Sequence, residues 1–347
     1  METLKRIIIS RTDNLGDVVL TLPMTGFLKK IFPQTEIIFL GNSYTKPLLE
    51  TCEHIDKIVE WDKIRVLSFR RQRRLFKQWQ ADVIIHVFPD KRIALLGAWS
   101  KIKIRIGTSH RWYHFLYANR RINLGRKKSL LHESELNMRL LIPLLINNDL
   151  PAKEDLPAYY GLNRVLPLPE RLLPIIEPHK FNVILHPKSK GSAREWGLDK
   201  YAELVRLLPI DKFNIIVAGT DFEAEQMEYF LRVYAGKIKD VTGELTLSEY
   251  ISLIHNADGM VACSTGPLHI AAALGKHALG IYAPLRPIFP QRWGPVGTNA
   301  IFFVDDKECY LCRKNNHCEC IEHISAQQVA DELFKRAMNI HHCKHNV

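Results

Sequence analysis

The stretch RTDNLGDVVLTLP, residues 11–23, places two carboxylates directly after an apolar run that is typical of a buried strand. A carboxylate at the carboxyl end of a strand can accept a proton from a bound hydroxyl group. The same carboxylate can also stabilise the first turn of the following helix. We predict that Asp17 is a catalytic base, and Asp13 is the nearby rival for that role.

A second stretch that could do chemistry is HPKSKGSAREW, residues 186–196, which also follows a predicted strand. It combines cations, hydroxyls and a flexible glycine, the groups that share the charge of a diphosphate. The spacing is not that of a P-loop, and an ordinary polar loop is an equal alternative. The residues expected to hold the diphosphate are Lys188, Ser189, Lys190 and Arg194.

A third stretch, CSTGPLHIAAALGK (263–276), leaves a strand and enters a helix. Ser264 and Thr265 suit the helix cap, and Gly266 permits close approach of a ligand to N–H groups that favour phosphate. His269 lies in the first turns, where a structural role is the more frequent one. Farther upstream, Glu223 could accept from sugar hydroxyls or simply stabilise a helix start.

Four cysteines gather in twelve residues near the C-terminus: Cys309, Cys312, Cys318 and Cys320. Four thiolates can hold structural zinc, but the second pair is C-x-C and the intervening loop is short for tetrahedral closure. Zinc and free or redox-sensitive thiols both stay open, with the thiols favoured. We predict no catalytic metal and no cofactor.

Positive charge is concentrated in the first half of the chain. Residues 1–165 contain 28 Lys and Arg against 16 Asp and Glu, whereas residues 166–347 contain 20 against 21. Segments 63–77 and 101–128 contain no acidic residue at all. This pattern indicates either a solvated basic face or a site for an anionic partner such as nucleic acid, acidic lipid or a phosphorylated glycan.

The composition is that of a globular protein of about two domains. No run approaches the roughly 18 apolar residues that span a bilayer, and the N-terminus lacks the apolar core of a signal peptide. Seven cysteines, an odd number, fit reduced thiols better than a disulfide framework. We expect a cytoplasmic protein.

Short β-branched runs alternate with longer helical patterns, which indicates parallel sheets with crossover helices. The prolines of residues 151–178 predict a semi-rigid connection. We therefore expect two doubly wound α/β domains, 1–165 and 166–347, that face each other across a cleft, with ligands at the carboxyl ends of their strands. A last helix at 325–338 could pack back on the first domain.

The expected strands are 6–10, 36–41, 55–61, 82–88, 102–107, 182–187, 213–219, 259–263 and 277–283. The expected helices are 17–32, 66–79, 91–99, 130–147, 198–208, 221–234, 246–256, 267–275 and 325–338.

Three blocks resemble the hallmark motifs of glycosyltransferase family 9, the ADP-heptose:lipopolysaccharide heptosyltransferases. They are residues 11–23, residues 186–205 (HPKSKGSAREWGLDKYAELV) and residues 263–295, which begin CSTGPLHIAAALGK. Residues 81–112 resemble the family segment between them, and the cysteine-rich tail is similar to that of some members. The resemblance follows the order of the family motifs and covers nearly the whole chain.

The resemblance implies a GT-B fold, with acceptor bound by the first domain and sugar nucleotide by the second. By position, Asp17 matches the family's base and Arg194 the basic residue on the donor diphosphate. Glu223 falls where a ribose-contacting glutamate occurs, and the donor loop corresponds to Thr265, Gly266 and His269. Some heptosyltransferases carry Asp where this chain has Ser264, so related donor sugars stay open.

The expected activity is inverting, metal-independent transfer of a heptose or related sugar from a nucleotide sugar, with ADP-heptose as the expected donor, to the inner core of lipopolysaccharide. The residues expected to contact this anionic acceptor are Asp13, Asn14, Arg65 and Arg111. Peripheral contact with the inner membrane is expected, and nucleic acid is not. The alternatives are a sugar-nucleotide epimerase of the same architecture and a basic nucleic-acid-binding protein.

Overall fold

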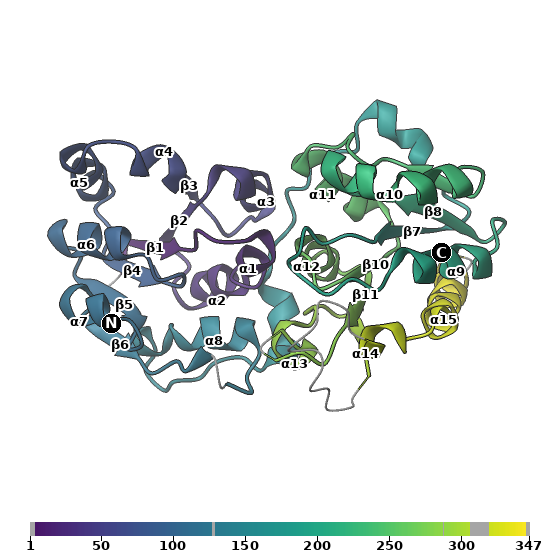
Figure 1. Cartoon of the computed structure of the whole chain (residues 1–347). Helices are drawn as coiled ribbons and strands as arrows, with labels where there is room; N and C mark the ends of the chain where they lie inside the picture. The colour runs from purple at the N-terminus through teal and green to yellow at the C-terminus, as the bar shows by residue number, and fades with distance from the viewer. Residues whose placement is uncertain (1–3, 127–128, 287, 306–318, 345–347) are drawn as a thin grey trace. The chain divides into compact units, whose positions relative to one another are not determined.

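The computed structural model describes residues 4–126, 129–286, 288–305 and 319–344. The chain forms two compact units, unit 1 (residues 1–165) and unit 2 (residues 166–347). Each unit is a parallel sheet flanked by helices (Figure 1).

Unit 1 is built on a six-stranded parallel sheet in the order β3-β2-β1-β4-β5-β6. Its first strand carries Ile7, Ile8 and Ile9, all fully buried, because helices cover both faces of the sheet. The strands are β1 (Arg6–Ser10), β2 (Glu36–Gly41), β3 (Lys57–Glu60), β4 (Val83–His86), β5 (Ile104–Thr108) and β6 (Arg120–Ile122).

The helices of unit 1 are mostly short. They are α1 (Leu15–Val19), α2 (Pro23–Ile31), α3 (Lys46–Thr51), α4 (Trp61–Arg65), α5 (Phe69–Gln78), α6 (Lys91–Trp99), α7 (Trp112–Tyr117) and α8 (Glu133–Arg139). The described part of the unit also contains the 3-10 helices η1 (Ser43–Thr45), η3 (Ile142–Leu144) and η4 (Lys153–Tyr159).

The helix expected over residues 17–32 is two helices in the structure, α1 and α2. Pro23 has no N–H to continue the hydrogen-bond ladder from α1, and it becomes the first residue of α2 instead. The helix expected over 130–147 is likewise shorter, because Pro143 lies in a separate 3-10 turn after α8. Residue 61, expected at the end of a strand, begins α4.

Unit 2 repeats the same topology, with strand order β12-β11-β10-β7-β8-β9. The strands are β7 (Phe181–His186), β8 (Phe213–Val217), β9 (Ile238–Asp240), β10 (Gly259–Cys263), β11 (His277–Tyr282) and β12 (Ile301–Val304). The helices are η5 (Glu170–Ile175), α9 (Leu198–Leu207), α10 (Asp221–Tyr234), α11 (Leu247–Asn256), α12 (Gly266–Ala273), α13 (Pro290–Trp293), α14 (Glu319–Glu322) and α15 (Ala326–Lys344).

The last helix, α15, packs against α9 within unit 2. Its residues Val329, Ala330 and Leu333 are fully buried in the core that covers β7 and β8. The expectation that α15 also packs back on the first domain stays a prediction. The Pro-rich connection is more regular than expected, since it contains η4 and η5.

No helix within the described ranges combines the length and the apolar character that crossing a bilayer requires.

Candidate active site

In both units, most of the candidate residues lie where the strand order reverses. In unit 1 this point lies between β1 and β4, and in unit 2 between β7 and β10. Open α/β sheets bind ligands at this point, outside the carboxyl ends of the strands. The stretches that begin at Arg11, His186 and Cys263 all leave strands at such a point.

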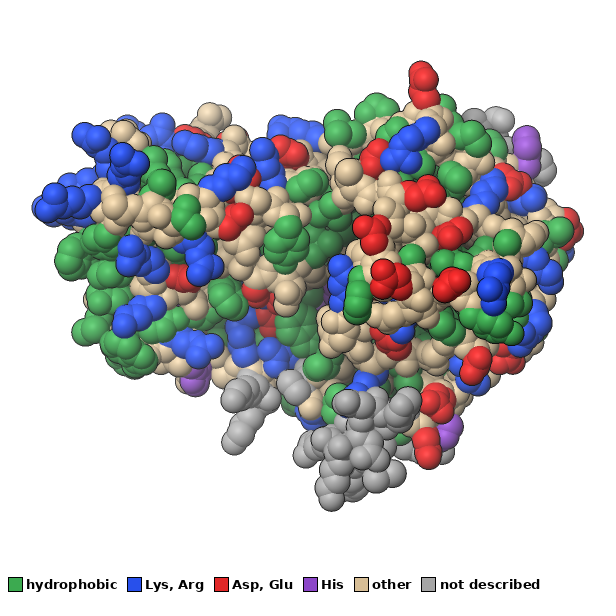
Figure 2. Space-filling view, turned by 45° about the horizontal axis from the view of Figure 1, so that its top comes forward, with side chains coloured by type: hydrophobic (Ala, Val, Ile, Leu, Met, Phe, Trp, Pro, Cys, Tyr) green, Lys and Arg blue, Asp and Glu red, His purple; other side chains and the backbone are tan. Residues whose placement is uncertain are grey.

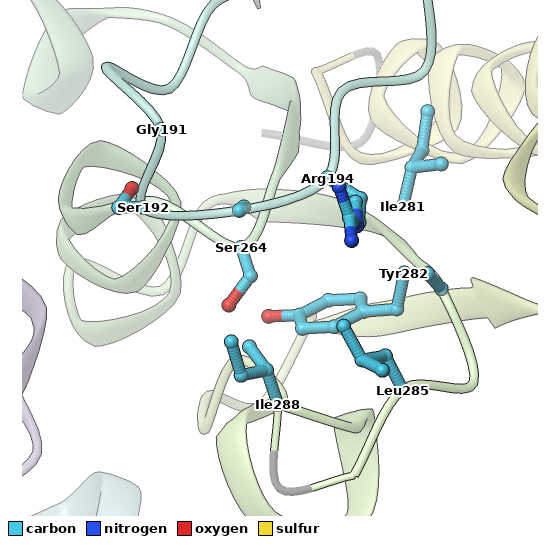
Figure 3. Close-up of a pocket in the computed structure, with 10 residues that line it drawn as sticks. Gly191, Ser192, Arg194, Ser264, Ile281, Tyr282, Leu285 and Ile288 are labelled. Carbon is cyan, nitrogen blue, oxygen red and sulfur yellow. The ribbon is translucent and has the colours of Figure 1, made fainter. Parts of the chain in front are cut away.

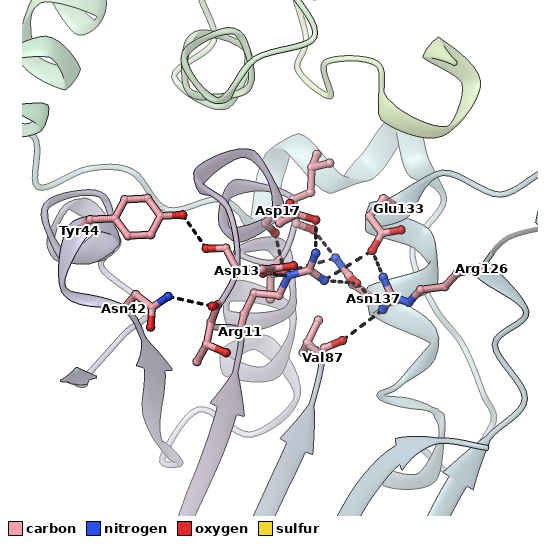
Figure 4. A network of polar contacts seen from close by, with 12 residues as sticks. Arg11, Asp13, Asp17, Asn42, Tyr44, Val87, Arg126, Glu133 and Asn137 are labelled. Carbon is pink, nitrogen blue, oxygen red and sulfur yellow. Dashed lines mark hydrogen bonds and ion pairs between the residues drawn. The ribbon is translucent and has the colours of Figure 1, made fainter. Parts of the chain in front are cut away.

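In unit 1 the two candidate carboxylates share one buried cation (Figure 4). Arg11 Nε donates to Asp13 Oδ1 at 2.7 Å, and its Nη2 donates to Asp17 Oδ1. Arg11 is almost fully buried, whereas each carboxylate keeps a small solvent-accessible part. The guanidinium therefore holds both carboxylates at the end of β1 while leaving them within reach of a ligand.

Further charged and polar side chains contact Arg11 on the side of α8. Glu133, at the start of α8, is 1% exposed and pairs with both Arg11 and Arg126. Asn137, one turn further along α8, accepts from Arg11 Nη1 at 3.4 Å and from Arg126 Nη2 at 3.1 Å. Its own amide donates to the Leu20 carbonyl at 3.1 Å, which ties α8 to the segment after α1. Buried charges need such partners, and here they fix the orientation of Arg11.

Burial raises the pKa of the Asp13 carboxyl to about 6, and the charge of Asp17 adds to the rise against the lowering effect of Arg11. The backbone carbonyl of Asp13 accepts from the Tyr44 hydroxyl at 2.6 Å. Burial, followed by the charges of Asp13 and Asp17, raises the pKa of Tyr44 to about 12. Tyr44 therefore stays a neutral donor at neutral pH and holds the loop backbone.

The other residues predicted to contact an acceptor lie along the same edge of the sheet. Asn14 is an exposed cap residue at the start of α1. Arg65 is the last residue of α4, the helix that follows β3. Arg111 lies between β5 and α7, and both arginines are exposed. In the strand order each of these strands lies two positions from β1, roughly 10 Å away across the sheet. The structure thus groups Asp13, Asn14 and Asp17 and places the two arginines at the flanks.

In unit 2 the loop after β7 is organised by Glu195. Its carboxylate accepts from Lys188 Nζ at 2.5 Å, from Ser189 N at 3.0 Å and from Ser189 Oγ at 3.1 Å. Lys190 and Gly191 both have positive φ, 49° and 78°, so the turn between them depends on the freedom of glycine. Lys188 and Ser189 are therefore engaged within the loop, whereas Lys190 is exposed on it.

The start of α12 carries two buried polar atoms that lack a hydrogen-bond partner in the described structure. They are Thr265 Oγ1, on the N-cap residue, and His269 Nδ1, in the following turn. Burial lowers the pKa of His269 to about 4, so the ring is neutral at pH 7. Buried polar groups are seldom left unpaired, and this helix start has the N–H groups that favour an anion.

A cavity of about 270 Å³ lies beside Ser264, the residue before Thr265, but neither Thr265 nor His269 lines it (Figure 3). The loop after β7 lines one side of it through Arg194, and Ser264 lines it from the end of β10. The Ser264 side chain points toward the Tyr282 hydroxyl (Figure 3), which donates to the Trp293 carbonyl at 2.7 Å. Two of the predicted donor residues, Arg194 and Ser264, thus meet at one cavity. The full lining is Gly191, Ser192, Ala193, Arg194, Ser264, Ile281, Tyr282, Ala283, Leu285 and Ile288.

Glu223 has a structural role in the described chain. Its Oε2 accepts from Thr220 N at 2.8 Å and from Thr220 Oγ1 at 2.9 Å, which forms a capping box at the start of α10. The residue is 3% exposed. Contact with a ribose stays a prediction for this residue.

The predicted cysteine cluster lies mainly outside the described residues, since Cys309, Cys312 and Cys318 fall in the range 306–318. Cys320 is buried in α14 as part of the unit 2 core. Within the described ranges, the structure contains no group of three or more His, Cys, Asp or Glu side chains placed to hold a metal ion.

Sequence reasoning missed the residues that organise both sites: Arg11, Arg126, Glu133, Asn137 and Glu195. Arg11 and Glu195 lie inside the quoted stretches, so a charge count within each stretch would have paired Arg11 with the two aspartates and Lys188 with Glu195. Glu133 lies 122 residues from its partner Arg11, and no local pattern signals that contact.

Two Rossmann-like units, one with a carboxylate pair and the other with a cavity beside a helix start, form the architecture of GT-B glycosyltransferases. Two relatives of known sequence, one solved structure and one family model agree with this class. A Haemophilus influenzae protein to which a glycosyltransferase function is ascribed is 29% identical over 310 residues, 84% of this chain and 86% of that protein. The lipopolysaccharide core heptosyltransferase OpsX of the same organism is 23% identical over 83% of this chain and 81% of its own.

The fold is also shared with a solved structure. Escherichia coli ADP-heptose lipopolysaccharide heptosyltransferase II superposes with a TM-score of 0.74 at 17% identity, over 97% of this chain and 100% of its own. The model of glycosyltransferase family 9 (heptosyltransferase) matches residues 69–321. The chain belongs to glycosyltransferase family 9 and is a glycosyltransferase with a GT-B fold. Membership favours the transferase over the epimerase and the nucleic-acid-binding protein that the sequence left open.

Proposed function

We propose that the protein transfers a heptose or a closely related sugar, with inversion, from a nucleotide sugar to an anionic lipopolysaccharide precursor. ADP-heptose is the first candidate donor, since relatives are named as heptosyltransferases. The observation that carries the proposal is the pairing of Asp13 and Asp17 with one buried arginine at the end of β1.

Asp17 accepts the proton of the attacking hydroxyl in this proposal. A general base needs a fixed orientation and an accessible oxygen, and the contact with Arg11 supplies the orientation. General-base assistance is typically worth roughly 10²–10⁴ in rate. Asp13 is placed to bind the acceptor beside it, where its raised pKa lets it donate as well as accept a hydrogen bond at mildly acidic pH.

Stabilisation of the departing nucleoside diphosphate falls to the cavity of unit 2. Arg194 supplies a guanidinium fork, and the first N–H groups of α12 supply a positive dipole end. The unpartnered Thr265 Oγ1 and His269 Nδ1 support a polar ligand at this helix start. Lys188 acts indirectly through Glu195, since it is already paired. These cations would carry out the charge neutralisation for which other transferases use a metal, so we propose transfer without metal or cofactor.

The proposed acceptor, the inner core of lipopolysaccharide, is rich in carboxylate and phosphate, and the basic character of residues 1–165 suits it. We propose a cytoplasmic location for the reaction, with no nucleic-acid partner.

The test is to incubate the protein with a panel of ADP-linked and other nucleotide sugars and to follow nucleoside diphosphate release with and without heptose-deficient lipopolysaccharide. Acceptor-dependent release with ADP-heptose is expected, together with attachment of the sugar to the acceptor. Release from no donor, or release that does not depend on acceptor, would contradict the proposal.

A further inference from the structure

Helix α7 of unit 1 carries an apolar stripe that faces solvent. Trp112, Phe115 and Leu116 are 62%, 59% and 64% exposed. Their spacing of three and four residues places them on one face of the helix. Apolar side chains scattered singly on a surface need no explanation, but three large ones on one helix face indicate an interaction site.

The opposite face of α7 fixes the helix to the sheet. His114 is fully buried, and its Nδ1 lies 2.8 Å from the Thr108 carbonyl at the end of β5. Gly107 makes this contact possible, because a Cβ at that position would lie 2.6 Å from His114 Nδ1. The outward stripe is therefore held in place by packing on its inner side.

Two basic side chains lie against the rings of the stripe, and the segment that contains α7 is strongly basic. Lys91 Nζ lies 4.8 Å from the centre of the Trp112 ring, and the Arg121 guanidinium lies 4.9 Å from that of Phe115. Residues 63–132 contain 18 Lys and Arg but only two acidic residues, Asp82 and Asp90. Figure 2 shows exposed hydrophobic side chains among Lys and Arg on unit 1, toward the left end of the view. The site is thus both apolar and strongly cationic.

We propose that α7 docks unit 1 on an anionic lipid bilayer, with Trp112, Phe115 and Leu116 entering the interface and the surrounding Lys and Arg facing the lipid headgroups. Tryptophan and phenylalanine beside basic residues are the side chains that bind at such an interface. Each Lys or Arg near an anionic surface raises the binding constant about fivefold.

Other occupants fit less well. A second copy of the chain would bring one cationic surface against another, which costs free energy. Single-stranded nucleic acid would use aromatic rings for stacking, but an exposed leucine such as Leu116 offers no ring. An anionic bilayer suits both the apolar side chains of the stripe and the positive charge of the neighbouring Lys and Arg.

The experiment measures co-sedimentation of the full chain with vesicles of phosphatidylcholine alone or of phosphatidylcholine with phosphatidylglycerol, at low and high salt. The variant Trp112→Ser/Phe115→Ser/Leu116→Ser removes the stripe. The matched control, Phe222→Ser/Tyr229→Ser/Val233→Ser, removes three exposed apolar side chains from α10, which carries several acidic residues. A conservative variant, Phe115→Trp, keeps the apolar character. Thermal unfolding of each variant verifies the fold.

We expect the wild type, the α10 control and Phe115→Trp to bind only the anionic vesicles, and high salt to weaken that binding. The stripe variant should bind at least about tenfold more weakly at an unchanged unfolding temperature. Equal binding by the stripe variant would overturn the proposal. Binding of a single-stranded oligonucleotide, but not of vesicles, would instead assign the surface to nucleic acid. The vesicles contain no sugar donor or acceptor, so this result is independent of the proposed transferase activity.

Discussion

The guanidinium of Arg11 joins the carboxylate of Asp17 to that of Asp13, and all three side chains leave the chain within seven residues of one another at the end of β1. Buried Glu133 and Asn137 hold the same guanidinium from behind. Asp17 is therefore oriented by a charged network that reaches α8, more than 110 residues further along the chain. The chain belongs to a family of glycosyltransferases. This network is the reason why we propose Asp17 as the acceptor of the proton.

Replacement of Asp17 by Asn tests that assignment. The amide keeps the size of the side chain but cannot accept the acceptor's proton. We expect kcat to fall by roughly 10²–10⁴, with little change in the dissociation constant of the donor. Single-turnover kinetics and isothermal titration with the nucleotide sugar separate the two quantities. Asp13→Asn is the neighbouring control, and a larger loss of kcat in that variant than in Asp17→Asn would move the base to Asp13.

The general architecture could be predicted from the sequence because the central strands of the two sheets are short apolar runs that helices cover on both faces. Ile7, Ile8 and Ile9 illustrate this pattern, since they are wholly buried in β1. The edge strands β6 and β9 were missed because three residues have little hydrophobic pattern, and β12 was missed although its sequence, IFFV, is apolar. The break between α1 and α2 was missed although Pro23 signals it.

Only the site residues that lie together in one short stretch of sequence could be predicted. Asp13 and Asp17 lie in one short stretch, and so do Arg194 and the loop that carries it. The partners that fix these residues come from distant segments, as with Arg11 and Glu133. Glu195 is a different case, because it lies inside the quoted stretch 186–196. It can accept from Ser189 N only because the backbone turns at Lys190 and Gly191, and the sequence does not show that turn.

The raised pKa of Asp13 makes the stability of the protein depend on pH. Because burial raises this pKa from 3.8 to about 6, the folded protein holds the proton more tightly than the unfolded chain does. Asp13 thus contributes stability that is fully present below about pH 4 and is lost as the pH rises through 6. Asp13→Asn removes this contribution. Urea unfolding at a series of pH values should show the wild type losing stability relative to Asp13→Asn between these limits.

The exposed side chain of Glu154 provides the control for that experiment. Glu154→Gln should follow the wild type across the same range. A constant difference in stability between wild type and Asp13→Asn at every pH would mean that burial does not shift the proton affinity of Asp13.

Replacement of Glu195 by Gln tests the organisation of the donor loop. The variant loses the ion pair with Lys188 and weakens the two bonds from Ser189, so the loop that carries Arg194 becomes less ordered. Loss of a hydrogen bond to a charged group is worth about tenfold in affinity, so we expect the KM for the nucleotide sugar to rise by about that factor. The value of kcat should change less. Glu225→Gln, an exposed change on α10, should leave KM unaltered, and an unaltered KM in Glu195→Gln as well would show that the loop keeps its shape without this carboxylate.

Two substitutions of Glu223 separate its capping role from the ribose contact that the family resemblance implies. Glu223→Ala removes both bonds from Thr220 and should lower the free energy of unfolding by about 1 kcal/mol. Glu223→Gln keeps a capping acceptor and should retain most of that stability, because glutamine also completes a capping box. Chemical denaturation measures both values, and titration with the nucleotide sugar gives donor affinity. A neutral amide accepts weaker hydrogen bonds than a carboxylate, so the predicted ribose contact should make Glu223→Gln bind donor more weakly at nearly unchanged stability. Donor binding equal to that of the wild type would leave Glu223 with its capping role alone.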